Sequence, residues 1–283
     1  MSLKQVSVSK VFDGNQFKFI HNSIELECDM TFSIYIPDRT NTEEIPIVFW
    51  LSGLTCTDDN FVQKAGAQKF AAQEGLAIVC PDTSPRGENI PDDLKGDYDL
   101  GLGASFYINA TKKPWSKHYS MYNYITDELP KVLKQSSLPV NTKMCSIMGH
   151  SMGGYGALMI ALKNPGKYKS VSAFAPICSP MNCQWGEKAF SNYLGDNKQT
   201  WKDYDPCSLI SNAESSLPIL VDQGKDDPFL SHQLKPELLQ KVCEEKEYPL
   251  TLRFHSGYDH SYFFISTFIE DHIKYHSLSL KIQ

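Results

Sequence analysis

The sequence lacks the features that mark membrane, secreted and nucleic-acid-binding proteins. No apolar run approaches the roughly 18 residues that a membrane-spanning helix needs. The first ten residues, MSLKQVSVSK, contain no apolar segment of the kind found in a secretory signal. The chain carries 27 basic and 33 acidic residues, a net charge of −6, and has no basic block for nucleic acid. We therefore expect a cytoplasmic protein with no membrane and no nucleic-acid partner.

Motifs for common cofactors and metals are also missing. There is no P-loop, and residues 101–103 (Gly-Leu-Gly) lack the further glycine of a dinucleotide fingerprint. No His/Cys/Asp cluster has the spacing of a zinc site. The eight cysteines are scattered without a Cys-x-x-Cys pair, so in a chain of this length we expect reduced thiols rather than a disulfide framework.

What the sequence does contain is a series of strand-like segments. Residues 17–20 and 24–37 alternate apolar and polar side chains, which predicts antiparallel strands at a sheet edge. Continuous apolar runs follow, and runs of this length are typical of parallel strands buried on both faces. They are Ile45–Leu51, Leu76–Cys80, Met144–Met148, Val171–Ala175, Ile219–Val221 and Leu250–Phe254.

Segments with helical spacing separate these runs. They are Asn60–Glu74, Tyr119–Lys134, Ser151–Leu162 and Tyr262–Tyr275. Strands that alternate with helices predict one α/β domain over residues 1–283, with a mostly parallel central sheet flanked by helices. We expect the polar stretch Ser179–Ser216 to lie above the carboxyl edge of the sheet, where such folds bind ligands.

The segment at residues 149–153, Gly-His-Ser-Met-Gly, matches the G-x-S-x-G nucleophile elbow of the α/β-hydrolase fold. A predicted strand precedes it and a predicted helix follows, as the elbow requires. Such a tight turn strains the serine and needs small neighbours, here Gly149, Gly153 and Gly154. We predict that Ser151 is the nucleophile, rather than a chance serine in a glycine-rich turn. His150 is expected to point away from Ser151, under the turn, in a structural role.

A serine nucleophile needs a base and an acid, which follow it along the chain in this fold. His260 is the predicted base because it lies in the loop between the last strand and the final helix. His232 and His255 are weaker candidates, the first in a polar segment and the second within a strand. The acid should follow the run Ile219–Val221, and the turn spacing favours Asp227 over Asp226, which remains the alternative. The acid would hold the imidazole in one tautomer.

Two backbone N–H groups are predicted to form the oxyanion hole. One belongs to Met152, the residue after the nucleophile, and the other to Leu54, in the glycine loop after an early strand. Two such donors stabilise a tetrahedral oxyanion by about 3 kcal/mol each. Cys56 lies two residues beyond Leu54 and is expected either to face the site or to be a buried inert thiol.

The sequence resembles the S-formylglutathione hydrolase family, also called esterase D in animals. The resemblance rests on segments that span nearly the whole chain in order: WLSGLTCTDDNF (50–61), PDTSPRG (81–87), GHSMGGYGAL (149–158), KNPGKYKSVSAFAPICSP (163–180), DQGKDDPFL (222–230) and GYDHSYFFISTFI (257–269). It implies a cytosolic enzyme, often a homodimer, that hydrolyses S-formylglutathione to glutathione and formate without a metal or organic cofactor.

The resemblance also supports the site residues already named. It favours Ser151, Asp227 and His260 as the triad, with Leu54 and Met152 as oxyanion donors. One departure is Tyr155, which stands where close relatives carry histidine, so the pocket wall is expected to differ there. Glutathione carries two carboxylates and an amine, and its polar contacts are predicted among Arg86, Trp185, Cys56, Trp115 and Lys117.

Three other functions compete with this hypothesis. A general short-chain carboxylesterase would use the same triad on other small acyl esters. A catalytically silent binding protein of the hydrolase fold would have a broken triad, whereas all three residue types are present here. An acyltransferase would need an acceptor site that excludes water, and no sequence feature indicates one.

Overall fold

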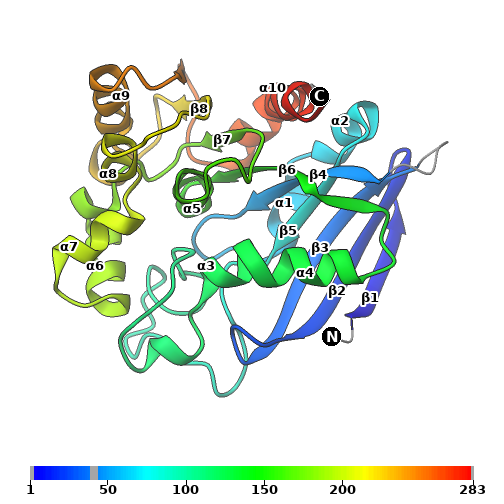
Figure 1. Ribbon diagram of the computed structural model, residues 1–283, viewed down its shortest axis with the longest axis horizontal. Coiled ribbons are helices and arrows are strands. Elements are labelled where there is room, and N and C mark those ends of the chain that lie inside the picture. Colours follow the sequence, from blue (N-terminus) through cyan, green and yellow to red (C-terminus); the bar gives the residue numbers. More distant parts are fainter. Residues whose placement is uncertain (1–2, 39–43, 282–283) are drawn as a thin grey trace.

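One nine-stranded sheet runs through the molecule, with the strand order β1-β2-β3-β5-β4-β6-β7-β8-β9. The computed structural model describes residues 3–38 and 44–281 (Figure 1). The strands are β1 (Leu3–Lys10), β2 (Gly14–Ser23), β3 (Cys28–Pro37), β4 (Ile45–Leu51), β5 (Ala77–Pro81), β6 (Val140–His150), β7 (Val171–Phe174), β8 (Ile219–Gly224) and β9 (Leu250–His255).

The sheet has an antiparallel end and a parallel remainder, as predicted for an α/β-hydrolase fold. Strands β1 to β3 pair antiparallel with one another, and β3 pairs antiparallel with β5. From β5 through β4, β6, β7 and β8 to β9 every pairing is parallel. Parallel strands place their carboxyl ends at one edge, so the loops after β4, β6 and β8 meet there.

The boundary between the second and third strands differs from the prediction. Ile24 was expected in a strand, but residues 24–27 form the turn between β2 and β3. The carboxylate of Glu128 caps this turn, accepting hydrogen bonds from the backbone N–H groups of Ile24 at 2.7 Å and Glu25 at 3.1 Å. A contact about 100 residues away in the chain thus sets the turn.

Helices cover both faces of the sheet (Figure 1). On one face lie α1 (Asp59–Lys64), α2 (Ala67–Glu74) and α10 (Tyr262–Lys281). On the other lie α5 (Met152–Lys163) and α4 (Leu129–Gln135), the latter preceded by η1 (Trp115–Lys117), α3 (Met121–Asn123) and η2 (Tyr124–Glu128). Among the described residues, none of the helices combines the length and apolar character that crossing a bilayer requires.

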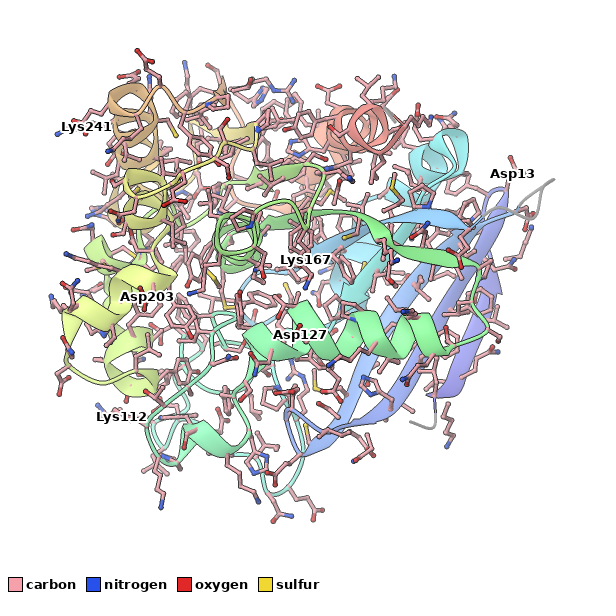
Figure 2. All side chains as sticks on the ribbon, in the orientation of Figure 1. Asp13, Lys112, Asp127, Lys167, Asp203 and Lys241 are labelled. Atoms are coloured by element: carbon pink, nitrogen blue, oxygen red, sulfur yellow. The ribbon has the colours of Figure 1, made fainter. Side chains whose placement is uncertain are left out.

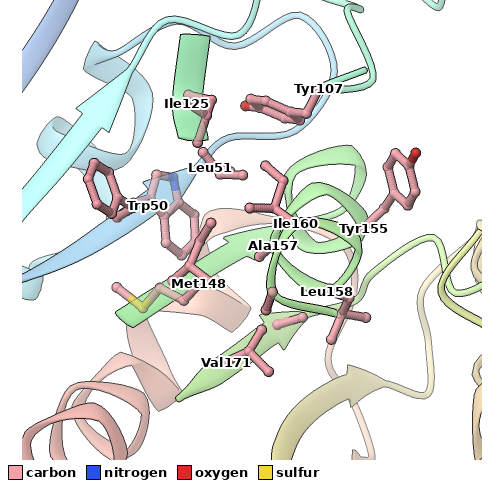
Figure 3. Packing of buried hydrophobic residues seen from close by; sticks show 14 of the residues in the cluster. Trp50, Leu51, Tyr107, Ile125, Met148, Tyr155, Ala157, Leu158, Ile160 and Val171 are labelled. Carbon is pink, nitrogen blue, oxygen red and sulfur yellow. The ribbon is translucent and has the colours of Figure 1, made fainter. Parts of the chain in front are cut away.

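The core packs α5 against the central strands. Leu51 of β4 lies on the side of the sheet that α5 covers, where Ala157 and Ile160 are completely buried (Figure 3). The neighbouring Trp50 points to the opposite face and stacks on Phe61 of α1, with ring centroids 3.8 Å apart. Side chains fill the space between the sheet and its helices throughout (Figure 2). This packing fixes the start of α5 relative to the ends of β4 and β6, the region that holds Ser151.

The segment expected above the carboxyl edge is largely helical. It contains η3 (Pro180–Asn182), α6 (Gln184–Tyr193), α7 (Lys198–Trp201), η4 (Lys202–Tyr204) and α8 (Pro206–Ser211). Helix α8 packs against α5 and α9 (Pro236–Glu245), and η5 (Leu230–Leu234) precedes α9. Helix α6 carries Trp185 to the pocket that Ser151 lines, so this part of the segment does border the site.

Candidate active site

Ser151 occupies the turn between β6 and α5 with a strained backbone. Its φ of 57° and ψ of −121° lie outside the regions that a non-glycine residue normally adopts. The turn is held on both sides, because the Ser151 N–H donates to the Phe174 carbonyl at 3.0 Å and the Ser151 carbonyl accepts from Tyr155 N–H at 2.9 Å. The conformation is therefore that of the predicted elbow.

Close backbone approaches explain the glycines around Ser151. A Cβ on Gly149 would lie 2.3 Å from the Gly153 carbonyl oxygen, and one on Gly153 would lie 2.0 Å from that of Leu51. These distances are far below ordinary contact, and the atoms met are backbone atoms that cannot turn aside. The end of β4, the end of β6 and the first turn of α5 therefore touch through their main chains.

Asp227 and His260 lie in direct contact. His260 Nδ1 is 2.5 Å from Asp227 Oδ2, and the Asp227 side chain has no exposed surface. Asp227 Oδ1 accepts the Phe229 N–H at 2.8 Å, which fixes the carboxylate. An Nδ1–H that donates to this carboxylate leaves Nε2 as the acceptor of the imidazole.

The alternatives weighed for the base and the acid lie elsewhere. The Asp226 side chain is exposed, and its N–H donates to the Tyr258 carbonyl. His232 is exposed, and the ring of His255 packs against Phe268 with centroids 3.8 Å apart. None of them contacts His260 or Ser151.

Ser151 and His260 line one cavity of about 380 Å³ at the carboxyl edge of the sheet. The loop after β4 contributes Leu54 and Cys56, and α6 contributes Trp185. The rest of the lining comes from the other segments that meet at this edge: Gly53, Thr55, Asn60, Lys64, Tyr98, His150, Phe229 and Tyr262. The lining is mixed, with polar and aromatic side chains.

Two backbone N–H groups beside Ser151 have no hydrogen-bond acceptor in residues 3–38 and 44–281, namely those of Leu54 and Met152. Met152 is the first residue of α5, so its N–H has no partner within the helix. The Leu54 loop is held by a hydrogen bond from Thr55 N–H to the Gly103 carbonyl at 2.9 Å, and Leu54 lines the cavity with Ser151. The two N–H groups that were predicted as oxyanion donors are thus unpaired within the described residues.

Of the residues predicted to contact substrate, Cys56 and Trp185 border the cavity. Burial raises the pKa of Cys56, which keeps it a thiol at neutral pH. The Trp185 indole N–H donates to the Tyr98 hydroxyl at 3.1 Å. This bond joins α6 to the loop that carries Tyr98, so the two residues form one aromatic wall.

Arg86, also predicted to contact substrate, does not line the cavity that Ser151 lines. Its guanidinium binds both oxygens of Asp82, at 2.8 and 3.0 Å, and donates to the Cys56 carbonyl at 3.2 Å. Arg86 therefore supports the loop from behind. Trp115 is likewise buried against other aromatic rings, and Lys117 pairs with a glutamate at the surface.

His150 does not point away from the site as expected. Its ring lies against that of His260, with centroids 4.4 Å apart, and it lines the same cavity as Ser151. Both of its ring nitrogens are buried. Burial lowers the pKa of His150 well below its usual range, so the ring beside His260 is neutral.

Tyr155 lies in the core and not in the pocket wall. It projects from the side of α5 that faces away from β6 (Figure 3), is fully buried, and packs near Phe106 and Phe190. Its hydroxyl has no partner among the residues that the structure describes. Tyr155 therefore does not line the cavity that contains Ser151, and the departure at this position lies in the core.

Sequence analysis did not name four of the lining residues as site residues, because each stands in an ordinary helix or loop context: Lys64, Tyr98, Phe229 and Tyr262. In the described part of the chain, no group of three or more His, Cys, Asp or Glu side chains could hold a metal ion.

Comparison with known proteins identifies close relatives. Residues 23–275 match the Esterase family model. The chain is 52% identical to the S-formylglutathione hydrolase of Mus musculus over 279 residues, 98% of each chain. A solved S-formylglutathione hydrolase from Agrobacterium tumefaciens superposes with a TM-score of 0.94 and 46% identity, covering 98% of this chain and 99% of that one. FphF, a serine hydrolase of Staphylococcus aureus, shares the fold at 19% identity, with a TM-score of 0.75 and coverage of 94% and 99%.

Proposed function

This chain belongs to the S-formylglutathione hydrolase family, within the esterases, and on that premise we propose that it hydrolyses S-formylglutathione with Ser151 as the nucleophile. One observation carries the assignment of the site. His260 is in contact with the buried Asp227 at the cavity that Ser151 lines. A nucleophile, a base and an orienting acid are the parts that acyl transfer needs.

In the first half of the reaction, the Ser151 hydroxyl attacks the formyl carbon while His260 Nε2 takes its proton. The carbonyl oxygen becomes an oxyanion that the N–H groups of Leu54 and Met152 stabilise, because both donors lack a partner within the described residues. Asp227 holds the imidazole in the required tautomer and stabilises its cation.

Collapse of this intermediate breaks the carbon–sulfur bond. The sulfur leaves with the electron pair and takes the proton from His260, which forms the glutathione thiol. A thiol with a pKa of about 8.5 is a good leaving group, so protonation of the leaving group by His260 matters less than in amide cleavage. Water, deprotonated by His260, then attacks the formyl ester of Ser151 and releases formate, which restores the free serine.

The neighbouring ring of His150 supports the same roles. A neutral imidazole in contact with His260 adds no competing positive charge when His260 becomes cationic. Two cationic rings 4.4 Å apart would instead repel each other. His150 therefore serves as an uncharged support for the base.

We also propose that the protein is cytoplasmic, that it is a single domain over residues 1–283 and that it forms a homodimer. One continuous sheet through the described residues supports the single domain. Sedimentation equilibrium gives the oligomeric state directly, and cell fractionation gives the location. A mass equal to one chain would refute the dimer.

The test of the main proposal compares wild type with Ser151→Ala on S-formylglutathione and on a short-chain aryl ester. We expect fast wild-type turnover of the thioester that the variant loses by a factor of about 10⁴ or more. Better turnover of the aryl ester would reduce the assignment to a general carboxylesterase. Unchanged activity in Ser151→Ala would refute Ser151 as nucleophile.

A further inference from the structure

Positive charge is scarce around the cavity once the existing ion pairs are taken into account. A hollow that shares Tyr98, Trp185 and Phe229 with the cavity contains Lys188, which pairs with Asp97 and Asp99. In the next hollow, Lys198 pairs with Glu187 and the Lys235 ammonium donates to the Asn182 carbonyl. These lysines already form ion pairs or hydrogen bonds within the protein.

Lys64, at the end of α1, is the exception. It lines the cavity itself and forms no ion pair with any residue in 3–38 or 44–281. The acidic residues that precede it on the chain do not compete, because Asp58 and Asp59 both pair with Lys18 of β2. An exposed ammonium with no carboxylate partner thus faces the space in front of Ser151.

The surroundings of Lys64 suit an anionic ligand. Its ammonium lies over the ring of Tyr262, 5.6 Å from the centroid, which directs it along the cavity wall. Tyr262 lines the cavity, but its hydroxyl is buried and interacts with the side chains of Ser52 and Cys56. Burial raises the pKa of Tyr262, so the residue adds no negative charge beside Lys64. Among the described residues, Lys64 is therefore an unpaired cation beside a neutral aromatic ring.

We propose that Lys64 forms a carboxylate-binding subsite that holds the thiol portion of the substrate. This inference rests on the proposed function, because glutathione supplies two carboxylates whereas a simple alkyl or aryl ester supplies none. A carboxylate accepts hydrogen bonds from the Lys64 ammonium, and a bond of this kind is stronger than one between neutral groups. The subsite acts on specificity and leaves the chemistry at Ser151 unchanged.

A local cation matters here because the whole chain is acidic. The net charge of −6 repels an anionic substrate at long range, so attraction must come from an unpaired positive charge at the site. Neutral esters gain nothing from Lys64. The subsite therefore favours thioesters that carry a carboxylate over neutral esters with the same acyl group.

The test uses Lys64→Gln and Lys64→Arg, with Lys69→Gln as the matched control. Lys69 is exposed on α2 and does not line the cavity, so Lys69→Gln removes the same charge away from the site. For S-formylglutathione we expect Lys64→Gln to raise KM about fivefold to tenfold with kcat within about twofold of wild type. Lys64→Arg should restore most of the affinity, and Lys69→Gln should match wild type.

A second pair of substrates separates this proposal from the proposed function. Two aryl acetates, one with a carboxylate on the leaving group and one without, report the charge preference even if S-formylglutathione is not hydrolysed. Loss of the preference in Lys64→Gln supports the subsite whatever the fate of the glutathione assignment. An unchanged preference, or an equal loss on both esters, would overturn it.

Discussion

Replacing Gly153 by alanine should separate the two halves of the active site. The added Cβ would lie 2.0 Å from the Leu51 carbonyl oxygen and 2.5 Å from that of Ser52. Because ordinary contact begins near 3.4 Å, β4 and α5 must part by about 1.4 Å. Leu54 follows these residues in the same loop, so its N–H moves away from that of Met152.

The expected cost is large for both activity and stability. A displacement of about 1 Å can lower a rate about 10²-fold, and loss of one oxyanion donor lowers kcat about 10²- to 10³-fold. Overpacking of this kind also destabilises by about 1–3 kcal/mol. We therefore expect Gly153→Ala to lower kcat at least about 100-fold and to shift the urea midpoint downward.

Gly154→Ala is the matched control on the next residue of the helix. There the Cβ would meet Pro176 Cβ at 3.0 Å and Ala173 Cβ at 3.3 Å, which small shifts relieve. Alanine also favours a helix over glycine by about 1 kcal/mol, so stability should change little. Steady-state kinetics and urea unfolding of both variants decide the matter. Wild-type kcat and stability in Gly153→Ala would refute the close approach on which the elbow depends.

Three further predictions follow from other parts of the structure. Asp227→Asn should lower kcat about 10⁴-fold in a pre-steady-state or initial-rate assay, whereas Asp226→Asn should stay near wild type; the reverse order would make Asp226 the acid. Burial lowers the pKa of His272 and His276, so below the unfolded value of about 6.5 the unfolded state binds more protons. Each histidine should then lower the stability as the pH falls below about 6.5, by at most about 1.4 kcal/mol per pH unit, and have no effect above pH 7; urea midpoints that stay constant from pH 7 to 5 would contradict this. Tyr155→Phe removes a buried hydroxyl without a partner and should preserve or raise the thermal midpoint, with unchanged KM and kcat; a change in substrate preference would return Tyr155 to the pocket wall.

The buried histidines belong to a polar chain that ties the final helix to the sheet. His276 contacts the hydroxyls of Ser170 and Ser172 at 2.7 and 2.8 Å, and Ser172 also contacts His272 at 2.8 Å. The Arg253 guanidinium donates hydrogen bonds to both carboxylate oxygens of the buried Asp222, and this carboxylate lies 3.3 Å from His272. Protonation of His272 and His276 at acidic pH would place positive charge inside this packed interface and weaken the contact between α10 and the sheet. Because α10 begins two residues after His260, the destabilisation would also affect the active site.

Features set by local sequence were predictable. The elbow is such a case, because the strand before Ser151, the glycines around it and the helix after it all lie within about twenty residues. The parallel strands were recognisable from their continuous apolar runs, since burial on both faces leaves no polar position. Strand β1 was missed because nearly all of its side chains are exposed, which leaves little periodic signal.

Features set by distant partners were not predictable. The turn at residues 24–27 depends on Glu128, and the neutral state of His150 depends on burial beside His260. Neither contact can be predicted from the residues next to it in the sequence. Helix α9 was missed as well, although its four buried residues follow helical spacing, because the strongly charged segment around them reads as a surface loop.

The contrast between Arg86 and Lys64 shows what sequence alone leaves out about binding. Both are basic residues near the glycine loop, and the sequence analysis named Arg86 but not Lys64 among the residues predicted to contact glutathione. In the structure, the Arg86 guanidinium donates hydrogen bonds to Asp82 and the Cys56 carbonyl, whereas Lys64 has no ion-pair partner in the described residues. A binding residue is one whose charge is still uncompensated after folding. Whether a charge is compensated depends on all the ion pairs and hydrogen bonds of the folded chain, so it can be judged only from the structure.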